Sequence, residues 1–389
     1  MPCLSFRRRM LFNMYQRTLR SSFLCLIILF LTIIIVILLT FRLSNLQQEC
    51  STPHINVPQP QQQQQQRIRY NSSSEHPVIF IGGMPRSGTT LMRAILDSHP
   101  LVRCGEETRV IPRILSMRAA WKKSPVEWNR LIAGGISESM IDSAVRAFVY
   151  EILLQHGKHA DVLCDKDPFV LKYTSYISSI FPNAKFLLLI RDARAVIHSV
   201  MTRKVTITGF SLSDYRQNLR LWNKGIETMV NQCTEIGKDK CLMVYYEQLV
   251  LQPKKTIADI LKYLNLPWVE SVLHHEELVG KKISLSKTEH SSDQVIKPIN
   301  TEALTKWVDH IPKDIKNELD TLAPMLKKLG YDIQSDVPTY GVADQLVLDN
   351  MNKLKENADF WNAKAKSYAR QAPNDTRPFQ NQSAQRTIH

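Results

Sequence analysis

Short apolar runs alternate along this chain with longer segments in which apolar side chains recur at helical spacing. The apolar runs cover 78–81, 186–190 and 241–246. They are bounded by turn residues and lack alternation, which is typical of strands buried on both faces. The helical spacing covers 89–98, 113–122, 136–156, 213–233 and 256–264. Strands that alternate with amphipathic helices predict an α/β domain whose parallel sheet is flanked by helices.

One apolar stretch differs from these in length. Residues 23–41 are 19 positions without a charge, and at 1.5 Å per residue they would span about 28 Å, close to the hydrocarbon core of a bilayer. Five arginines precede the stretch, whereas only Arg42 follows it closely. The positive-inside rule therefore predicts a cytoplasmic N-terminus and a lumenal remainder. A cleaved signal peptide is the alternative, but it would usually be shorter and followed by small residues. We expect a single transmembrane signal anchor.

The polar segment after the anchor contains six consecutive glutamines at 61–66, and such a composition cannot bury a core. Beyond about Val337 the helical periodicity is lost. The sequence therefore predicts a cytoplasmic tail at 1–22, an anchor at 23–41 and a flexible stem at 42–75. It further predicts a lumenal domain at 76–340 and a partly disordered extension at 341–389.

Charge and cysteine content agree with a lumenal domain. The net charge is +14, a modest basic excess that suits acidic ligands and is weak evidence by itself. In an oxidising compartment we expect two disulfides among the four cysteines of the domain, with Cys50 of the stem left over. Three glycosylation sequons are compatible with the same location, at Asn71, Asn374 and Asn381.

The first apolar run leads through a glycine turn into the helix at 89–98. A strand, a glycine turn and a helix present backbone N–H groups and a positive helix end to a phosphate. From Gly83 the spacing is G-x-x-x-x-G-T-T, so Gly88 and Thr90 take P-loop places. Thr89 stands where a P-loop has its lysine, and Arg86 carries the charge inside the loop. We expect this loop to bind a 5′-phosphate-like group without being an ordinary NTPase.

A second anion site is expected where the run at 186–190 turns into a helix. Arg191 and Ser199 flank that turn, and Arg203 lies one helical turn after Ser199. Arginine and serine satisfy a terminal phosphate by charge-assisted hydrogen bonds. Two such sites suit a nucleotide phosphorylated at both its 5′ and 3′ positions. The alternative for Arg191 is a surface ion pair with Asp192.

Several motifs carry a family resemblance. Gly-Met-Pro-Arg-Ser-Gly-Thr-Thr at 83–90, Arg-Asp-x-Arg-Ala-x-x-His-Ser at 191–199, Val-Tyr-Tyr-Glu-Gln-Leu at 244–249 and Asp-Gln-Val-Ile-Lys-Pro at 293–298 resemble the sulfotransferase superfamily. The segment 104–113 resembles specifically the tyrosylprotein sulfotransferases of the Golgi. The resemblance runs from about residue 78 to about residue 340. It implies the sulfotransferase fold, a homodimer, and transfer of sulfate from 3′-phosphoadenosine 5′-phosphosulfate to tyrosines of secretory and membrane proteins.

The resemblance also implies which residues bind the nucleotide. The 5′-phosphosulfate would lie against Arg86, Ser87, Gly88, Thr89 and Thr90. The 3′-phosphate would lie against Arg191, Ser199 and Arg203, with Tyr246 also on the nucleotide. A loop over the cofactor, followed by Lys306, would comprise Ser291, Ser292, Asp293, Gln294, Val295, Ile296, Lys297, Pro298, Ile299 and Asn300.

By the same resemblance, Glu107 is the general base, and Lys166, Ser291 and Arg86 stabilise the transition state. The acidic peptide would meet Arg109, Val110, Ile111, Pro112, Arg113 and Arg130. The family disulfides map to Cys104–Cys164 and Cys233–Cys241. A bridge holds two Cα atoms roughly 5.5 Å apart, so the first of them would bring Glu107 and Lys166 together.

Plainer interpretations of these residues stay open at this point. Lys166, flanked by Asp165 and Asp167, could belong to a solvated ion-pair cluster, and Glu106 competes with Glu107 as the base. The segment 109–113 could be helical, which puts both arginines on one face, or extended, since it contains Pro112.

No clustered metal-ligand signature is visible, so no metal is predicted, and the expected partners are acidic tyrosine-containing proteins, not nucleic acid. A carbohydrate sulfotransferase is the alternative enzyme. A catalytically inactive lumenal protein that binds acidic tails is the alternative from another class.

Overall fold

The computed structural model describes residues 34–36, 38, 76–286 and 289–368. The chain separates into two compact units, Met1–Ser73 and Ser74–His389, and each is considered by itself. In the first unit the described residues, 34–36 and 38, are helical. No helix among the described residues is long and apolar enough to cross a membrane. Most of the predicted anchor at 23–41, together with the tail and the stem, lies outside those residues.

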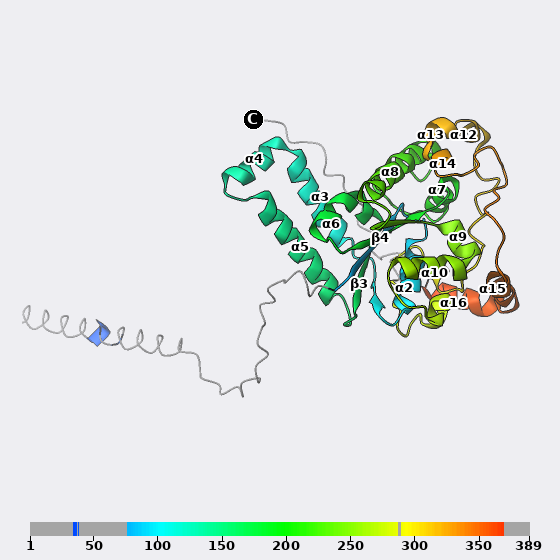
Figure 1. Ribbon diagram of the computed structural model, residues 1–389, viewed down its shortest axis with the longest axis horizontal. Coiled ribbons are helices and arrows are strands. Elements are labelled where there is room, and N and C mark those ends of the chain that lie inside the picture. The colour runs from blue at the N-terminus through cyan, green and yellow to red at the C-terminus, as the bar shows by residue number, and fades with distance from the viewer. Residues whose placement is uncertain (1–33, 37, 39–75, 287–288, 369–389) are drawn as a thin grey trace, which may run out of the picture. The chain divides into compact units, whose positions relative to one another are not determined.

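The second unit is built on a five-stranded parallel sheet in the order β2-β3-β1-β4-β5, which confirms the predicted sheet (Figure 1). The strands are β1 (Val78–Gly83), β2 (Val102–Arg103), β3 (Val162–Lys166), β4 (Lys185–Ile190) and β5 (Cys241–Tyr245). The central strand β1 is buried along its whole length. Alternate side chains enter different cores: Phe80 packs in one cluster, and Ile79 and Ile81 pack in the other. A strand with two buried faces needs apolar residues at every position, and this explains its continuous apolar run.

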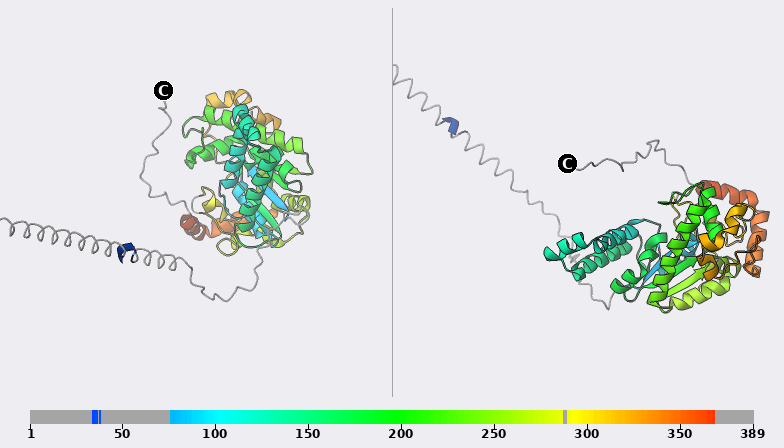
Figure 2. Two further views of the ribbon diagram at one scale, coloured as in Figure 1. Left: turned by 90° about the vertical axis from the view of Figure 1, so that its left-hand side faces the viewer. Right: turned by 90° about the horizontal axis from the view of Figure 1, so that it is seen from above.

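Helices cover both faces of the sheet (Figure 1). The core that contains Phe80 receives side chains from α5, α6, α7 and α8, and the core that contains Ile79 receives them from α2, α9 and α10. The helices α3, α4 and α5 project to one side of the domain (Figure 2). Their bounds are α2 (Thr89–Ser98), α3 (Val110–Lys123), α4 (Pro125–Ala133), α5 (Glu138–Gln155), α6 (Thr174–Ile180), α7 (Ala193–Thr202), α8 (Tyr215–Ile236), α9 (Tyr246–Leu251) and α10 (Pro253–Tyr263).

Shorter elements follow β3 and α10. They are η1 (Pro168–Tyr173), η2 (Glu270–Leu273), η3 (His275–Glu277), α11 (Ser292–Val295), α12 (Lys313–Asn317), α13 (Leu319–Leu322) and α14 (Met325–Lys328).

The extension at 341–389, predicted to be partly disordered, is helical over part of its length. Helices α15 (Gln345–Glu356) and α16 (Ala358–Tyr368) occupy it. Val347, Asn350 and Leu354 are buried at helical spacing along α15, and the Asn350 amide donates to the carbonyl oxygen of Ile299 at 3.0 Å. The extension therefore packs against the expected cofactor loop. Residues 369–389 lie outside the described residues.

Candidate active site

The opening turn leaves β1 and enters α2 at Thr89, as the sequence predicts. Gly88 has φ 99°, and a Cβ atom there would come within 2.4 Å of the Tyr246 ring. Arg86 also has a left-handed backbone, with φ 76°, a conformation that a non-glycine residue adopts at a cost and that is often found at functional sites. Ser87 Oγ is buried and has no hydrogen-bond partner among the described residues. The turn thus offers a tight backbone cradle and an unused hydroxyl.

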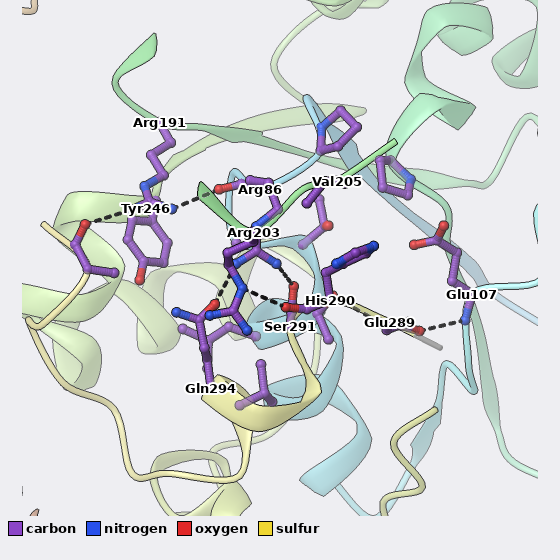
Figure 3. Close-up of a pocket in the computed structure, with 18 of the residues that line it drawn as sticks. Arg86, Glu107, Arg191, Arg203, Val205, Tyr246, Glu289, His290, Ser291 and Gln294 are labelled. Atoms are coloured by element: carbon purple, nitrogen blue, oxygen red, sulfur yellow. Dashed lines mark hydrogen bonds between the residues drawn. The ribbon is translucent and has the colours of Figure 1, made fainter. Parts of the chain in front are cut away.

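The Arg86 guanidinium lies at the centre of the cavity wall (Figure 3). Its Nε donates to Ser199 Oγ at 3.0 Å, and its two terminal nitrogens donate to Ser291 and Gln294. Burial, followed by the positive charges of Arg203 and Arg191, lowers the pKa of Arg86 to about 9. Two guanidinium groups that lower the pKa of a third form with it a site that an anion would stabilise.

The second expected anion group surrounds Arg191 (Figure 3). This side chain is buried, donates to the carbonyl oxygens of Arg86 at 2.8 Å and Ala303 at 2.7 Å, and lies 4.4 Å from the centre of the Tyr246 ring. The alternative interpretation of Arg191 is wrong, because Asp192 is paired with Arg194 at 2.8 Å instead. Arg203 donates to Asp293 and to the carbonyl oxygen of His290.

Glu107 and Lys166 lie on the other side of this cavity. Both disulfides are formed, Cys104–Cys164 with its Cα atoms 4.1 Å apart and Cys233–Cys241 with its Cα atoms 5.4 Å apart. Lys166 Nζ donates to Glu107 Oε2 at 2.9 Å, so the first bridge and this ion pair occur together. The solvated-cluster interpretation of Lys166 is wrong, since its side chain is 0% exposed.

A carboxylate that the sequence reasoning missed completes this group. Glu289 Oε2 accepts from Lys166 Nζ and from Thr90 Oγ1, both at 3.1 Å, and Glu289 Oε1 accepts from the backbone N–H of Glu107 at 3.1 Å (Figure 3). The only available signal was its position two residues before Ser291. Strand β3, which carries Lys166, was also missed, because charged residues follow its third position.

The residues predicted to meet a peptide begin at Arg109. This residue has φ 59° and precedes α3, so the arginines of 109–113 lie at a helix start. The Arg109 N–H donates to both oxygens of the buried Asp167 carboxylate, at 3.1 and 3.2 Å. Burial and then the charge of Glu107 raise the pKa of Asp167 to about 7.

The two halves line one cavity of about 880 Å³. The predicted residues that line it are Arg86, Gly88, Thr89, Thr90, Glu107, Arg109, Pro112, Arg113, Arg191, Arg203, Tyr246, Ser291, Asp293, Gln294, Val295, Lys297, Pro298, Ile299, Asn300 and Lys306. Others do not line it: Ser87, Val110, Ile111, Lys166, Ser199, Ser292 and Ile296. Ser199 and Lys166 nevertheless bond to residues that do.

Arg130 is a further predicted peptide contact that does not line this cavity. It lies on α4, pairs with Glu127 at 3.2 Å, and has a side chain that is 73% exposed. Residues from unexpected elements line the cavity instead, among them Asp167, Lys172 and, from α16, Asn362.

One group among the described residues has ligand atoms of the kind that metals bind. Atoms of His274, Glu276 and Glu277 lie within 4.8 Å of one another. None of the three lines the cavity. The neighbouring His275 is a packing residue, because it is fully buried with Nε2 2.9 Å from the carbonyl oxygen of Val295.

Comparison with known proteins identifies the class. Residues 77–270 match the model of the sulfotransferase family.

The particular family follows from relatives of high identity. Protein-tyrosine sulfotransferase A of Caenorhabditis elegans is 54% identical over 296 residues, which cover 76% of this chain and 77% of that protein. Protein-tyrosine sulfotransferase 1 of Danio rerio is 56% identical over 289 residues, covering 74% and 81%. Protein-tyrosine sulfotransferase 1 of Homo sapiens is 51% identical over 280 residues, covering 72% and 76%. The chain belongs to the protein-tyrosine sulfotransferases, and it is an enzyme of that family.

Proposed function

We propose that this enzyme transfers the sulfuryl group of 3′-phosphoadenosine 5′-phosphosulfate to tyrosine hydroxyls in acidic segments of secretory and membrane proteins. The observation that carries the proposal is the pairing of two unlike groups in one cavity. Arg86, Arg191 and Arg203 form a cluster of cations, in which burial and the charges of the other two arginines lower the pKa of Arg86. The Glu107–Lys166 pair lies across from them.

The fit of the donor rests on three features of the described residues. The cradle at Gly88 has no room for a side chain, Ser87 Oγ has an unused hydrogen-bonding capacity, and the arginine cluster favours negative charge. The loop 86–90 would hold the 5′-phosphosulfate, and Arg191, Ser199 and Arg203 the 3′-phosphate. Tyr246 and the residues 291–300 and Lys306 would enclose the nucleoside.

Glu107 would act as the base in an in-line attack. The phenol oxygen forms a bond to sulfur, its proton passes to Glu107, and the bond from sulfur to the 5′-phosphate breaks with its electron pair left on the phosphate. Full proton transfer before attack would cost roughly 8 kcal/mol, because the ordinary pKa values are about 10 for tyrosine and about 4.3 for glutamate. The proton therefore moves as the new bond forms. Lys166, Arg86 and Ser291 would stabilise the charge on the sulfuryl and bridging oxygens.

Recognition of the acceptor would be electrostatic. Arg109, whose side chain is 67% exposed, lines the cavity with Arg113 and Lys172. Three cations near the base suit an extended segment in which carboxylates flank the tyrosine.

We propose that the enzyme is a single-pass type II protein of the Golgi membrane with a lumenal catalytic domain. The apolar stretch at 23–41, its flanking arginines and the two disulfides support this location. Glycosylation would follow at the sequons, which lie outside the described residues. A homodimer is supported by exposed apolar side chains on α4 and α5, including Val126, Ile132 and Met140. Such a dimer would offer Arg130 a route to a peptide bound by the second copy.

A side-by-side acceptor assay tests the function. The full-length chain, in detergent, is incubated with donor carrying radioactive sulfate and one of three acceptors: an acidic tyrosine peptide, the same peptide with phenylalanine for tyrosine, or a glycan. We expect label on the tyrosine peptide alone. Label on the glycan and none on tyrosine would contradict the proposal.

A further inference from the structure

Glu289 connects the two halves of the cavity. Its carboxylate bonds to three elements at once: to Thr90 at the start of α2, to Lys166 at the end of β3, and to the backbone of Glu107. Thr90 belongs to the proposed donor loop and Lys166 to the proposed catalytic residues. The bond to the Glu107 N–H fixes the main chain that carries the proposed base.

The carboxylate is held in its charged form. Burial by itself would raise the pKa of Glu289, but the charges of Lys166 and Arg93, with the hydrogen bonds from Glu107 N–H and Lys166, bring that pKa below its ordinary value. A charged carboxylate with three donors is a rigid anchor, because each bond it makes is charge-assisted or fixed by the backbone.

The number of N–H donors on Lys166 indicates what Glu289 would contribute to the proposed reaction. An ammonium group has three N–H donors. The Lys166 side chain is fully buried, and Glu107 and Glu289 accept two of its N–H groups. In the proposed reaction the third would donate to an oxygen of the transferring group. When Glu107 takes the phenol proton it loses its charge, and its attraction for the ammonium group weakens. Glu289 keeps its charge throughout and would hold Lys166 in place as negative charge develops on the donor.

We propose that Glu289 is a positioning residue of the transfer reaction, which holds Lys166 and the main chain of Glu107 in register with the donor loop at Thr90. The inference rests on the proposed function. Glu289 does not touch the reacting atoms, and its effect is transmitted through Lys166 and Glu107.

The test compares Glu289→Gln and Glu289→Asp with the wild type in the full-length chain. The amide keeps the shape of the side chain but presents an N–H group to Lys166 or Thr90, which are themselves donors. We expect kcat to fall roughly 10- to 100-fold, the range found when a partner that orients a functional group is removed. The KM values for donor and peptide should stay within about twofold, since neither substrate loses a contact. The aspartate keeps the charge at a shorter reach, and its kcat should lie between the two.

A double-mutant cycle separates this role from general structural support. Because Glu289 acts in part through Lys166, Glu289→Gln should lower kcat by a smaller factor in the Lys166→Ala background than in the wild type. Glu318→Gln is the matched control, because Glu318 also bridges elements, through Arg216, but lies outside the cavity. Its kcat should equal that of the wild type. Thermal melting and binding of 3′-phosphoadenosine 5′-phosphate verify that each variant is folded.

Three results would overturn the inference: a normal kcat in Glu289→Gln, additive losses in the cycle, or tighter nucleotide binding with unchanged kcat. The last result would mean that the carboxylate only occupies a position that an anionic group of the donor would otherwise take. A wild type that sulfates no tyrosine would refute the proposed function and the inference with it. A wild type active on tyrosine with a normal Glu289→Gln would refute the inference alone.

Discussion

In the proposed reaction one half of the cavity, the donor half, would bind the nucleotide, and the other, the acceptor half, would bind the tyrosine peptide. The two halves are built in different ways. The donor half consists of two loops, 86–90 and 291–300, and a helix start at 191–203. Arg86 and Arg191 donate there to neutral side-chain and backbone oxygens, Arg203 also pairs with Asp293, and the net charge of these segments is positive. The acceptor half is assembled from 104–109 and β3, which are about sixty residues apart and are joined by Cys104–Cys164. There the charges are balanced in pairs such as Glu107–Lys166. The donor half therefore has an excess of positive charge that an anion would neutralise, whereas the charges of the acceptor half neutralise one another in ion pairs.

The largest effect is expected from Arg86→Ala, which removes the centre of the donor half. Arg86 joins Ser199, Ser291 and Gln294, so its loss should abolish both nucleotide binding and turnover. Calorimetric titration with 3′-phosphoadenosine 5′-phosphate and a turnover assay check this. Unchanged nucleotide affinity would show that the arginine cluster is not the donor site.

Removing the base should come next in size. Glu107→Gln should lower kcat by about 10²- to 10⁴-fold, the usual contribution of a general base. Glu106→Gln is the matched control and should keep its activity, since Glu106 is absent from the cavity lining. Steady-state kinetics on the tyrosine peptide distinguish the two. Equal losses in both variants would leave the base unassigned.

The two disulfides distinguish an effect on stability alone from an effect on the acceptor half, because only Cys104–Cys164 lies in that half. The loops they close differ, with separations of 60 and 8 residues. By the chain-entropy relation their loss should cost about 4 and about 2.5 kcal/mol. Cys104→Ser with Cys164→Ser should also lower kcat, because Glu107 and Lys166 lose their link. Cys233→Ser with Cys241→Ser should only destabilise. Denaturant unfolding and kinetics check both, and normal turnover in the first pair would contradict this account of the acceptor half.

A smaller effect is expected where the peptide is bound. Arg109→Ala with Arg113→Ala should raise the KM for an acidic tyrosine peptide and leave nucleotide affinity unchanged. Added salt should narrow the difference from the wild type, because exposed charges are screened. A neutral tyrosine peptide is the control and should be affected less. Equal effects on both peptides would argue against electrostatic recognition.

The smallest effect concerns Asp167, whose pKa is raised to about 7 from about 3.9 in an unfolded chain. The folded protein therefore holds this proton more tightly, and its stability falls as pH rises toward 7. Asp167→Asn removes that penalty while keeping an acceptor for the Arg109 N–H. Its melting temperature, compared with that of the wild type, should gain more at pH 8 than at pH 5. A gain independent of pH would mean that Asp167 is not protonated more readily when folded.

The sequence predicted the donor half far better than the acceptor half. The helix at Thr89–Ser98 begins and ends where the pattern places it, because glycines and a two-face buried strand leave a local signal. The anion site at Arg191 and Arg203 could be predicted for the same reason, since it follows a buried strand that turns into a helix. Strand β3 was not, since its apolar run is interrupted by charge at Asp165.

Residues brought together by tertiary contacts left little trace in the sequence. Glu289 reaches Lys166 across 123 positions, and no local pattern distinguishes it from other carboxylates. Likewise α16 places Asn362 on the cavity wall, although no residue of this helix is buried. Arg130 is the opposite case: the family resemblance predicted that it contacts the peptide, but in this structure it does not line the cavity.

The separation of the two halves is tested most directly by titrating 3′-phosphoadenosine 5′-phosphate into Glu107→Gln. We expect an affinity equal to that of the wild type, although the variant has lost turnover, because the proposed nucleotide contacts, Arg86, Arg191 and Arg203 among them, do not include Glu107. A loss of nucleotide affinity in this variant would contradict it.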